Sequence, residues 1–116
     1  MDTSTDGRSS RDYRRIACEE GFATVGLLAA NARLGDIGVP LLTMDGPAGF
    51  LARALVDTEA RLAAMDRDGV DMQLLMVSAP GVQVFPPTEA SALARSVNDE
   101  LSDLCRDHPD RFAALA

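Results

Sequence analysis

The sequence is poor in positive charge and in imidazole. Its 116 residues contain no lysine and one histidine, and the 11 basic residues are all arginine, scattered among 18 acidic residues. A net charge of −7 excludes a nucleic-acid-binding surface, which needs surplus Lys and Arg to neutralise phosphates. With His108 as the only imidazole, a zinc site built from several histidines is also excluded.

Long apolar runs, export signals and paired cysteines are lacking as well. No apolar stretch approaches the roughly 20 residues that span a bilayer, and the first ten residues are polar, so we expect a cytoplasmic protein that does not enter membranes. The two cysteines, Cys18 and Cys105, are far apart without a C-x-x-C spacing, and we expect both to be thiols that fill the core. No glycine pattern typical of a phosphate-binding loop is present.

The rest of the chain alternates between strand and helix patterns after a polar leader. Residues 1–14 are almost devoid of apolar side chains and are predicted to be a disordered leader. Glycines and prolines between residues 35 and 49 predict a loop region. The elements predicted from residue 15 onward are a short strand at 16–18 ending in Glu19-Glu20-Gly21, an amphipathic helix over 50–67 stopped by Gly69, a buried strand over 70–79, a helix capped by Thr88 and ended by Pro109, and a strand starting at Phe112.

This order predicts an α/β fold with a parallel sheet, because strands joined through helices form right-handed parallel crossovers. A complete (β/α)8 barrel needs roughly 250 residues, so any barrel formed by this chain is partial. In parallel α/β folds the reactive groups gather at the carboxyl ends of the strands. Two segments meet that condition: Glu19-Glu20-Gly21 after the first strand and Ser78-Ala79-Pro80-Gly81 after the second.

The residues in these segments allow few kinds of chemistry. Glu19 and Glu20 are adjacent in a strand, so only one of them can face a site, where its carboxylate could be a surface group or a ligand for a divalent metal. Ser78 has no base nearby in the sequence, and we expect it to keep the strand end small so that a ligand can approach. His108 precedes Pro109 in a helix-to-strand turn on the opposite face, where it is predicted to be structural.

Three segments together resemble a known family. IACEEGFAT, RLAAMDRDGVDMQLLMVSAPGVQ and ALARSVNDELSDLCRDHPDRFAALA are similar to the N-terminal third of the amidohydrolase-related metal-dependent enzymes, within the branch of hydroxybenzoate-type decarboxylases. The resemblance implies that residues 15–116 are the N-terminal part of a (β/α)8 TIM barrel, with its first two to three β/α units.

The resemblance also implies a metal-dependent reaction. In this family the first strand usually ends in a Glu-x-His pair that ligates Zn, Mn or Mg, and a further His and Asp come from later strands. Glu19 matches the ligand carboxylate, whereas Gly21 stands where the His is usual. The implied reaction is carbon–carbon cleavage of a small aromatic acid: the metal orients the carboxylate and adjacent hydroxyl, an acid protonates the ring carbon, and carbon dioxide leaves.

Three functions remain open at this stage. The first is a truncated member of the decarboxylase family, inactive as an isolated chain because Glu19 supplies at most one metal ligand. The second is a non-catalytic interaction module that self-associates as a homo-oligomer or completes a partner chain's barrel through an exposed sheet edge. The third is a metal-dependent hydrolase of the same superfamily.

Overall fold

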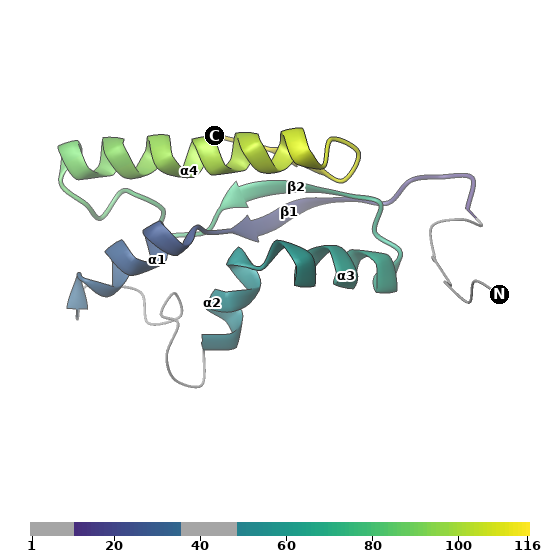
Figure 1. Cartoon of the computed structure of the whole chain (residues 1–116), viewed down its shortest axis with the longest axis horizontal. Coiled ribbons are helices and arrows are strands. Elements are labelled where there is room, and N and C mark those ends of the chain that lie inside the picture. The colour runs from purple at the N-terminus through teal and green to yellow at the C-terminus, as the bar shows by residue number, and fades with distance from the viewer. Residues whose placement is uncertain (1–10, 36–48) are drawn as a thin grey trace.

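The computed structural model describes residues 11–35 and 49–116 (Figure 1). The loop region predicted between residues 35 and 49 therefore lies almost wholly outside the described residues. The elements, in chain order, are β1 (Ile16–Phe22), α1 (Val25–Ala32), α2 (Gly49–Val56), α3 (Thr58–Asp68), β2 (Met72–Val77), α4 (Pro87–Asp107) and β3 (Phe112–Ala114).

The three strands of the described residues form one parallel sheet in the order β1-β2-β3. In the view of Figure 1, α4 runs along one side of the strands and α2 and α3 lie on the other. The predicted α/β class and the parallel pairing are confirmed. The strand predicted over 70–79 forms over Met72–Val77 as β2, lies at the centre of the sheet, and its Leu75 is completely buried.

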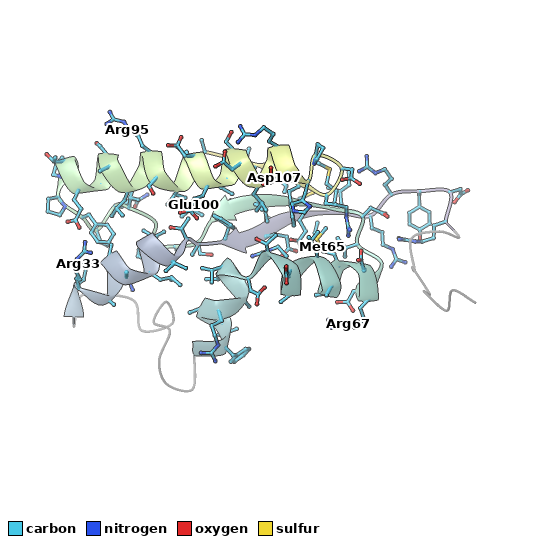
Figure 2. All side chains as sticks on the ribbon, viewed as in Figure 1. Arg33, Met65, Arg67, Arg95, Glu100 and Asp107 are labelled. Atoms are coloured by element: carbon cyan, nitrogen blue, oxygen red, sulfur yellow. The ribbon has the colours of Figure 1, made fainter. Side chains whose placement is uncertain are left out.

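One hydrophobic cluster joins the sheet to its helices. Figure 2 shows Met65 pointing from α3 toward the strands, whereas Arg67 of the same helix points away. The buried members of the cluster come from β1, α1, α3, β2, the loop after β2, α4 and β3, and are Phe22, Leu27, Ala30, Met65, Leu75, Phe85, Val97, Leu101 and Phe112. Because this cluster contains residues from every strand, the helices and the sheet depend on each other for burial of their apolar faces.

The first strand extends further than the sequence pattern predicts. Glu19, Glu20 and Gly21 do not follow β1 but form its last part, since β1 continues to Phe22 and pairs with β2 up to Val77. The register shifts between Ala17 and Glu20, which places one extra residue in β1 relative to β2. Such a bulge redirects side chains locally and is common beside active sites.

The predicted helix over 50–67 is wrong in one respect: the chain forms two helices there. Asp57 has extended backbone angles (φ −88°, ψ 95°), and its Oδ1 accepts a hydrogen bond from the Ala60 amide at 2.9 Å. Aspartate is among the best helix N-caps, so α3 starts afresh after Asp57. At the other end of α3, Gly69 adopts the predicted left-handed conformation (φ 71°).

The start of α4 also differs from the prediction. Thr88 was expected to cap the helix, but α4 begins at Pro87, and its N-cap residue, Pro86, makes no side-chain cap. Proline suits the first helical position because its ring fixes φ and its missing N–H would have no partner in the helix. The predicted end, just before Pro109, is correct within two residues.

Buried arginine and aspartate contacts fix the amino ends of the strands. Arg111 is 8% exposed, donates through Nε to the Asp71 carbonyl at 2.9 Å and forms an ion pair with Asp66 at 2.9 Å. The ring of His108 meets Phe112 edge-on, with centroids 5.8 Å apart. The amide of His108 also closes the last turn of α4, so its contacts are structural, as the sequence predicts.

Residues just before β1 add to this anchorage. Arg11 donates to the Gly69 carbonyl at 2.6 Å and lies 3.5 Å from the Asp71 carboxylate, which also accepts the Arg15 amide at 2.7 Å. The guanidinium groups of Arg11 and Arg15 lie 5.5 and 5.9 Å from the ring of Tyr13. Arg15 lowers the pKa of the Tyr13 phenol, first through its hydrogen bond and then through its charge. Residues 1–10 of the predicted leader lie outside the described residues.

Candidate functional site

The two adjacent glutamates at the end of β1 have different surroundings. Glu20 pairs laterally with the fully buried Leu75, is half-buried, and interacts electrostatically with Arg61 of α3. Glu19 falls within the register shift and is exposed. Glu19 is therefore the more exposed of the two glutamates, and its carboxylate is open to a ligand.

The carboxyl ends of β1 and β2 meet at Gly21 and Ser78. The Ser78 amide donates to the Phe22 carbonyl at 2.9 Å. A Cβ atom at Gly21 would lie only 2.6 Å from the Ser78 hydroxyl oxygen and 3.2 Å from Cδ2 of Leu55. The absence of a side chain at position 21 thus makes room for the Ser78 hydroxyl, which occupies the space where a histidine at this position would begin.

Adding a methyl group at Gly21 is expected to lower stability through this contact. We expect Gly21→Ala to lower the free energy of unfolding by about 1–3 kcal/mol, as overpacking typically does. Urea unfolding of the chain would measure this change. Ser78 Oγ is the atom nearest to the added methyl group. The double variant Gly21→Ala, Ser78→Ala should therefore lose less unfolding free energy than the sum of the losses in the two single variants. Strict additivity would show that the two side chains do not contact each other.

A third residue of this region, Arg61, was not recognised from the sequence. It is half-buried and donates to the carbonyl of Gly21 at 2.7 Å and to Oε1 of Gln73 at 3.1 Å. Burial lowers the pKa of its guanidinium, and the charge of Glu20 acts in the opposite direction. Its spacing of four residues from the buried Met65 was the available signal, since such residues share a helix face.

A cleft opens beside the carboxyl end of β2. It has a volume of about 570 Å³ and is bounded by Val77, the loop from Ala79 to Val84, the α4 residues Ala94, Val97 and Asn98, and Ala116. Ala79 and Gly81 line this cleft, whereas Ser78, the residue predicted to leave room for a ligand, does not. Glu19 is not among the residues that line the cleft.

A complete metal site is not formed by the part of the chain that the structure describes. Within residues 11–35 and 49–116, no three His, Cys, Asp or Glu side chains lie close enough together to hold a metal ion. His108 lies at the amino ends of the strands, and Cys18, predicted to fill the core, is exposed on β1. Cys105 packs against the core as predicted, and burial raises the pKa of its thiol.

No helix in the described residues is long and apolar enough to cross a membrane. This finding agrees with the lack of long apolar runs in the sequence.

A parallel sheet with its candidate groups toward the carboxyl ends of the strands is typical of α/β proteins, both barrels and open sheets. No family model matches the chain. Among proteins of known activity, it is 37% identical over 84 residues to the gamma-resorcylate decarboxylase of a Rhizobium species, and 34% identical over 103 residues to that of a Polaromonas species. These matches cover 64% and 88% of this chain but 26% and 29% of the relatives.

Solved structures show the same relationship. The chain matches 5-carboxyvanillate decarboxylase from Novosphingobium aromaticivorans, solved with manganese and 4-hydroxy-3-methoxy-5-nitrobenzoic acid, with a TM-score of 0.80 and 34% identity over 90% of this chain and 34% of the other. It matches 2,6-dihydroxybenzoate decarboxylase from Rhizobium with a TM-score of 0.69 and 32% identity, over 89% of this chain and 29% of that enzyme.

The chain is thus a homologue of decarboxylases that act on hydroxybenzoate-type acids, and the partial matches fit an N-terminal segment of such an enzyme. The predicted partial barrel is therefore confirmed. The chain spans about a third or less of the length of the relatives it matches.

Proposed function

We propose that this chain supplies the first strands of a divalent-metal-dependent decarboxylase acting on a small hydroxylated aromatic acid, with Glu19 as a metal ligand. The observation that carries the proposal is the exposed carboxylate of Glu19 at the register shift in the middle of β1, in a sheet that matches a manganese-containing decarboxylase with a TM-score of 0.80. Carboxylate oxygen is a suitable ligand for Mn, Mg or Zn.

The described residues fit such a metal only in part. Glu19 offers one oxygen ligand, Gly21 offers none, and a divalent ion normally takes at least three protein or substrate groups. We therefore propose that the isolated chain is inactive and that further ligands are needed from outside the residues described here. When bound, the metal would polarise an oxygen of the aromatic acid as a Lewis acid.

The roles proposed for this chain's own residues follow from their positions. Glu19 holds a negative charge at the strand edge, and Gly21 and Ser78 keep the adjoining strand ends small. The cleft beside β2, lined mainly by apolar side chains, suits one face of an aromatic ring. The overall change is that of a carbon–carbon lyase: the bond to the carboxylate breaks, the ring carbon gains a proton and carbon dioxide leaves.

A chimeric enzyme tests this function directly. Residues 11–116 would replace the corresponding N-terminal segment of the Rhizobium gamma-resorcylate decarboxylase, and carbon dioxide release would be measured with 2,6-dihydroxybenzoate and with 5-carboxyvanillate in the presence of Mn²⁺. We expect turnover of at least one of these acids by the chimera and none by the isolated chain. A folded chimera that decarboxylates neither acid would contradict the proposal, and turnover by the isolated chain would contradict its predicted inactivity.

The hydrolase reading is less well supported, because the relatives and structures described above are named as decarboxylases. We also propose a cytoplasmic location, which the two free thiols support because a reducing compartment preserves them.

Self-association is a second candidate property, favoured by the edge of the sheet. A groove of about 440 Å³ runs beside β3 and is lined by apolar side chains that include Leu101, Phe112 and the half-exposed Leu115. Exposed strand edges pair readily with other strands. Size-exclusion chromatography with light scattering should give a molecular mass above the 12.3 kDa of the monomer. This measured mass should rise with protein concentration. A monomer at every concentration would exclude this property.

A further inference from the structure

Arg61 joins three elements around the carboxyl end of β1. From α3, its Nη2 donates to the carbonyl of Gly21 in β1 at 2.7 Å, and its Nη1 donates to the Gln73 side chain of β2 at 3.1 Å. Nη2 also lies 3.3 and 3.4 Å from the carbonyls of Leu55 and Ala54 in the last turn of α2. The three elements meet at the guanidinium group of one side chain.

These contacts require the shape of a guanidinium group. Its planar fork presents several donors in fixed directions, whereas a lysine ammonium is a point charge on a flexible stem. The last carbonyls of a helix lack partners within the helix, and basic side chains commonly satisfy them. Arg61 does so for α2, which also accepts the Ala23 amide through the Leu55 carbonyl at 3.3 Å.

The contact with Gly21 matters because the strand ladder does not fix the preceding residues. Cys18 and Glu19 lie in the register shift, and regular pairing resumes only at Glu20 and Gly21. The backbone that carries Glu19 is therefore held at its carboxyl side by the first paired residues. There the Phe22 carbonyl accepts from the amide of Ser78, the residue just after β2, while the Gly21 carbonyl accepts from Arg61.

We infer that Arg61 is a positioning residue that fixes the carboxyl end of β1 and thereby the direction of Glu19. The inference deepens the proposed function, on which the importance of Glu19 rests. Arg61 itself faces backbone carbonyls and an amide oxygen, so it acts through β1 and does not touch the reacting groups.

The test is nuclear magnetic resonance on the 116-residue chain, comparing Arg61→Lys with two matched arginine controls. Arg111→Lys changes another buried arginine at the amino ends of the strands, and Arg67→Lys changes an exposed arginine on α3. The amides of Ala23 and Ser78 report on the carboxyl end of β1, and the amides of Asp71 and Met72, which donate to the Arg15 carbonyl, report on the other end.

In Arg61→Lys we expect altered amide shifts at residues 18–22, a lower order parameter at Glu19, and a loss of hydrogen-exchange protection at Ala23 and Ser78 on the order of tenfold. Arg111→Lys should alter the amides of Asp71 and Met72 and leave residues 18–22 unchanged, when the melting temperatures of the two variants are similar. Arg67→Lys should change neither end. Equal effects of Arg61→Lys and Arg111→Lys on residues 18–22, or no effect of Arg61→Lys there, would overturn the inference.

A second variant covers the case in which Arg61→Lys does not fold. Gln73→Met removes one acceptor of the guanidinium and keeps the Gly21 carbonyl, so it should produce smaller changes of the same kind at residues 18–22. Unchanged spectra there would overturn the inference. These measurements involve no metal and no aromatic acid. A negative result for Arg61 therefore does not bear on the activity of the chimera, and an inactive chimera does not bear on the positioning role of Arg61.

Discussion

Replacing Glu19 by glutamine in the chimeric decarboxylase is expected to lower kcat about a thousandfold. Glutamine keeps the size of the side chain but removes the negative charge that the proposed ligand contributes. Metal-assisted charge stabilisation is worth several kcal/mol in the transition state, and each 1.36 kcal/mol changes the rate tenfold. The manganese content of the purified chimera, measured by atomic emission, should fall in parallel.

The matched control is Glu59→Gln, which removes an exposed carboxylate from the first turn of α3. It changes the net charge by the same amount, and we expect the activity and manganese content of the chimera to stay within twofold of their original values. Glu19→Asp should retain part of both, since the carboxylate is kept but set back by one methylene. In an active chimera, full activity and full manganese content of Glu19→Gln would exclude Glu19 as a ligand.

Truncating Phe112 to alanine is expected to remove most of the stability of the chain. Phe112 is 2% exposed, opens the three-residue strand β3, and packs in the cluster that includes Leu75 and Leu101. Removing a buried phenylalanine side chain typically costs about 3–5 kcal/mol, against a total of about 5–15 kcal/mol for a native domain. Urea unfolding followed by circular dichroism should therefore show a strongly lowered midpoint or no cooperative transition.

Leu115→Ala provides the control on the same segment. Leu115 is 52% exposed, although its amide donates to the Leu75 carbonyl at 2.9 Å. The alanine keeps that backbone hydrogen bond and exposes no core residue, so we expect the free energy of unfolding to change by no more than about 0.5 kcal/mol. Similar losses for the two variants would show that β3 does not depend on the Phe112 side chain.

The class of fold could be predicted from the sequence because its signals are local. The apolar stripe from Ala90 to Cys105 predicts α4, and the run around Leu75 predicts a buried strand. Gly69 marks the end of α3 because a left-handed residue is needed there, and glycine adopts it without strain. Each of these features depends on neighbours in the chain, so periodicity alone reveals it.

Features that depend on distant partners could not be predicted. The extension of β1 through Glu19 to Phe22 arises from pairing with β2, more than fifty residues later, and the extra residue in β1 has no sequence signature of its own. The break at Asp57 was missed because the apolar repeat continues across it, although aspartate at this position is a recognised cap.

The candidate site was predictable only through the resemblance to a family. A carboxylate at a strand end is by itself an ordinary surface group, and it was the matched segment around Glu19 that singled it out. The burial of Arg61 became visible only when α2, α3 and the two strands were assembled, because none of its acceptors shows in the one-dimensional pattern.

The two ends of the sheet have separate tasks. Arg111 and Asp71 secure the scaffold at the amino ends of the strands, and Glu19 and Ser78 lie at the carboxyl ends. In the proposed decarboxylase, substitutions toward the carboxyl ends can therefore change the site without altering the contacts of Arg111 and Asp71 at the amino ends. For a lineage of enzymes this separation favours divergence: new substrate preferences can arise while the framework that folds the chain is inherited unchanged.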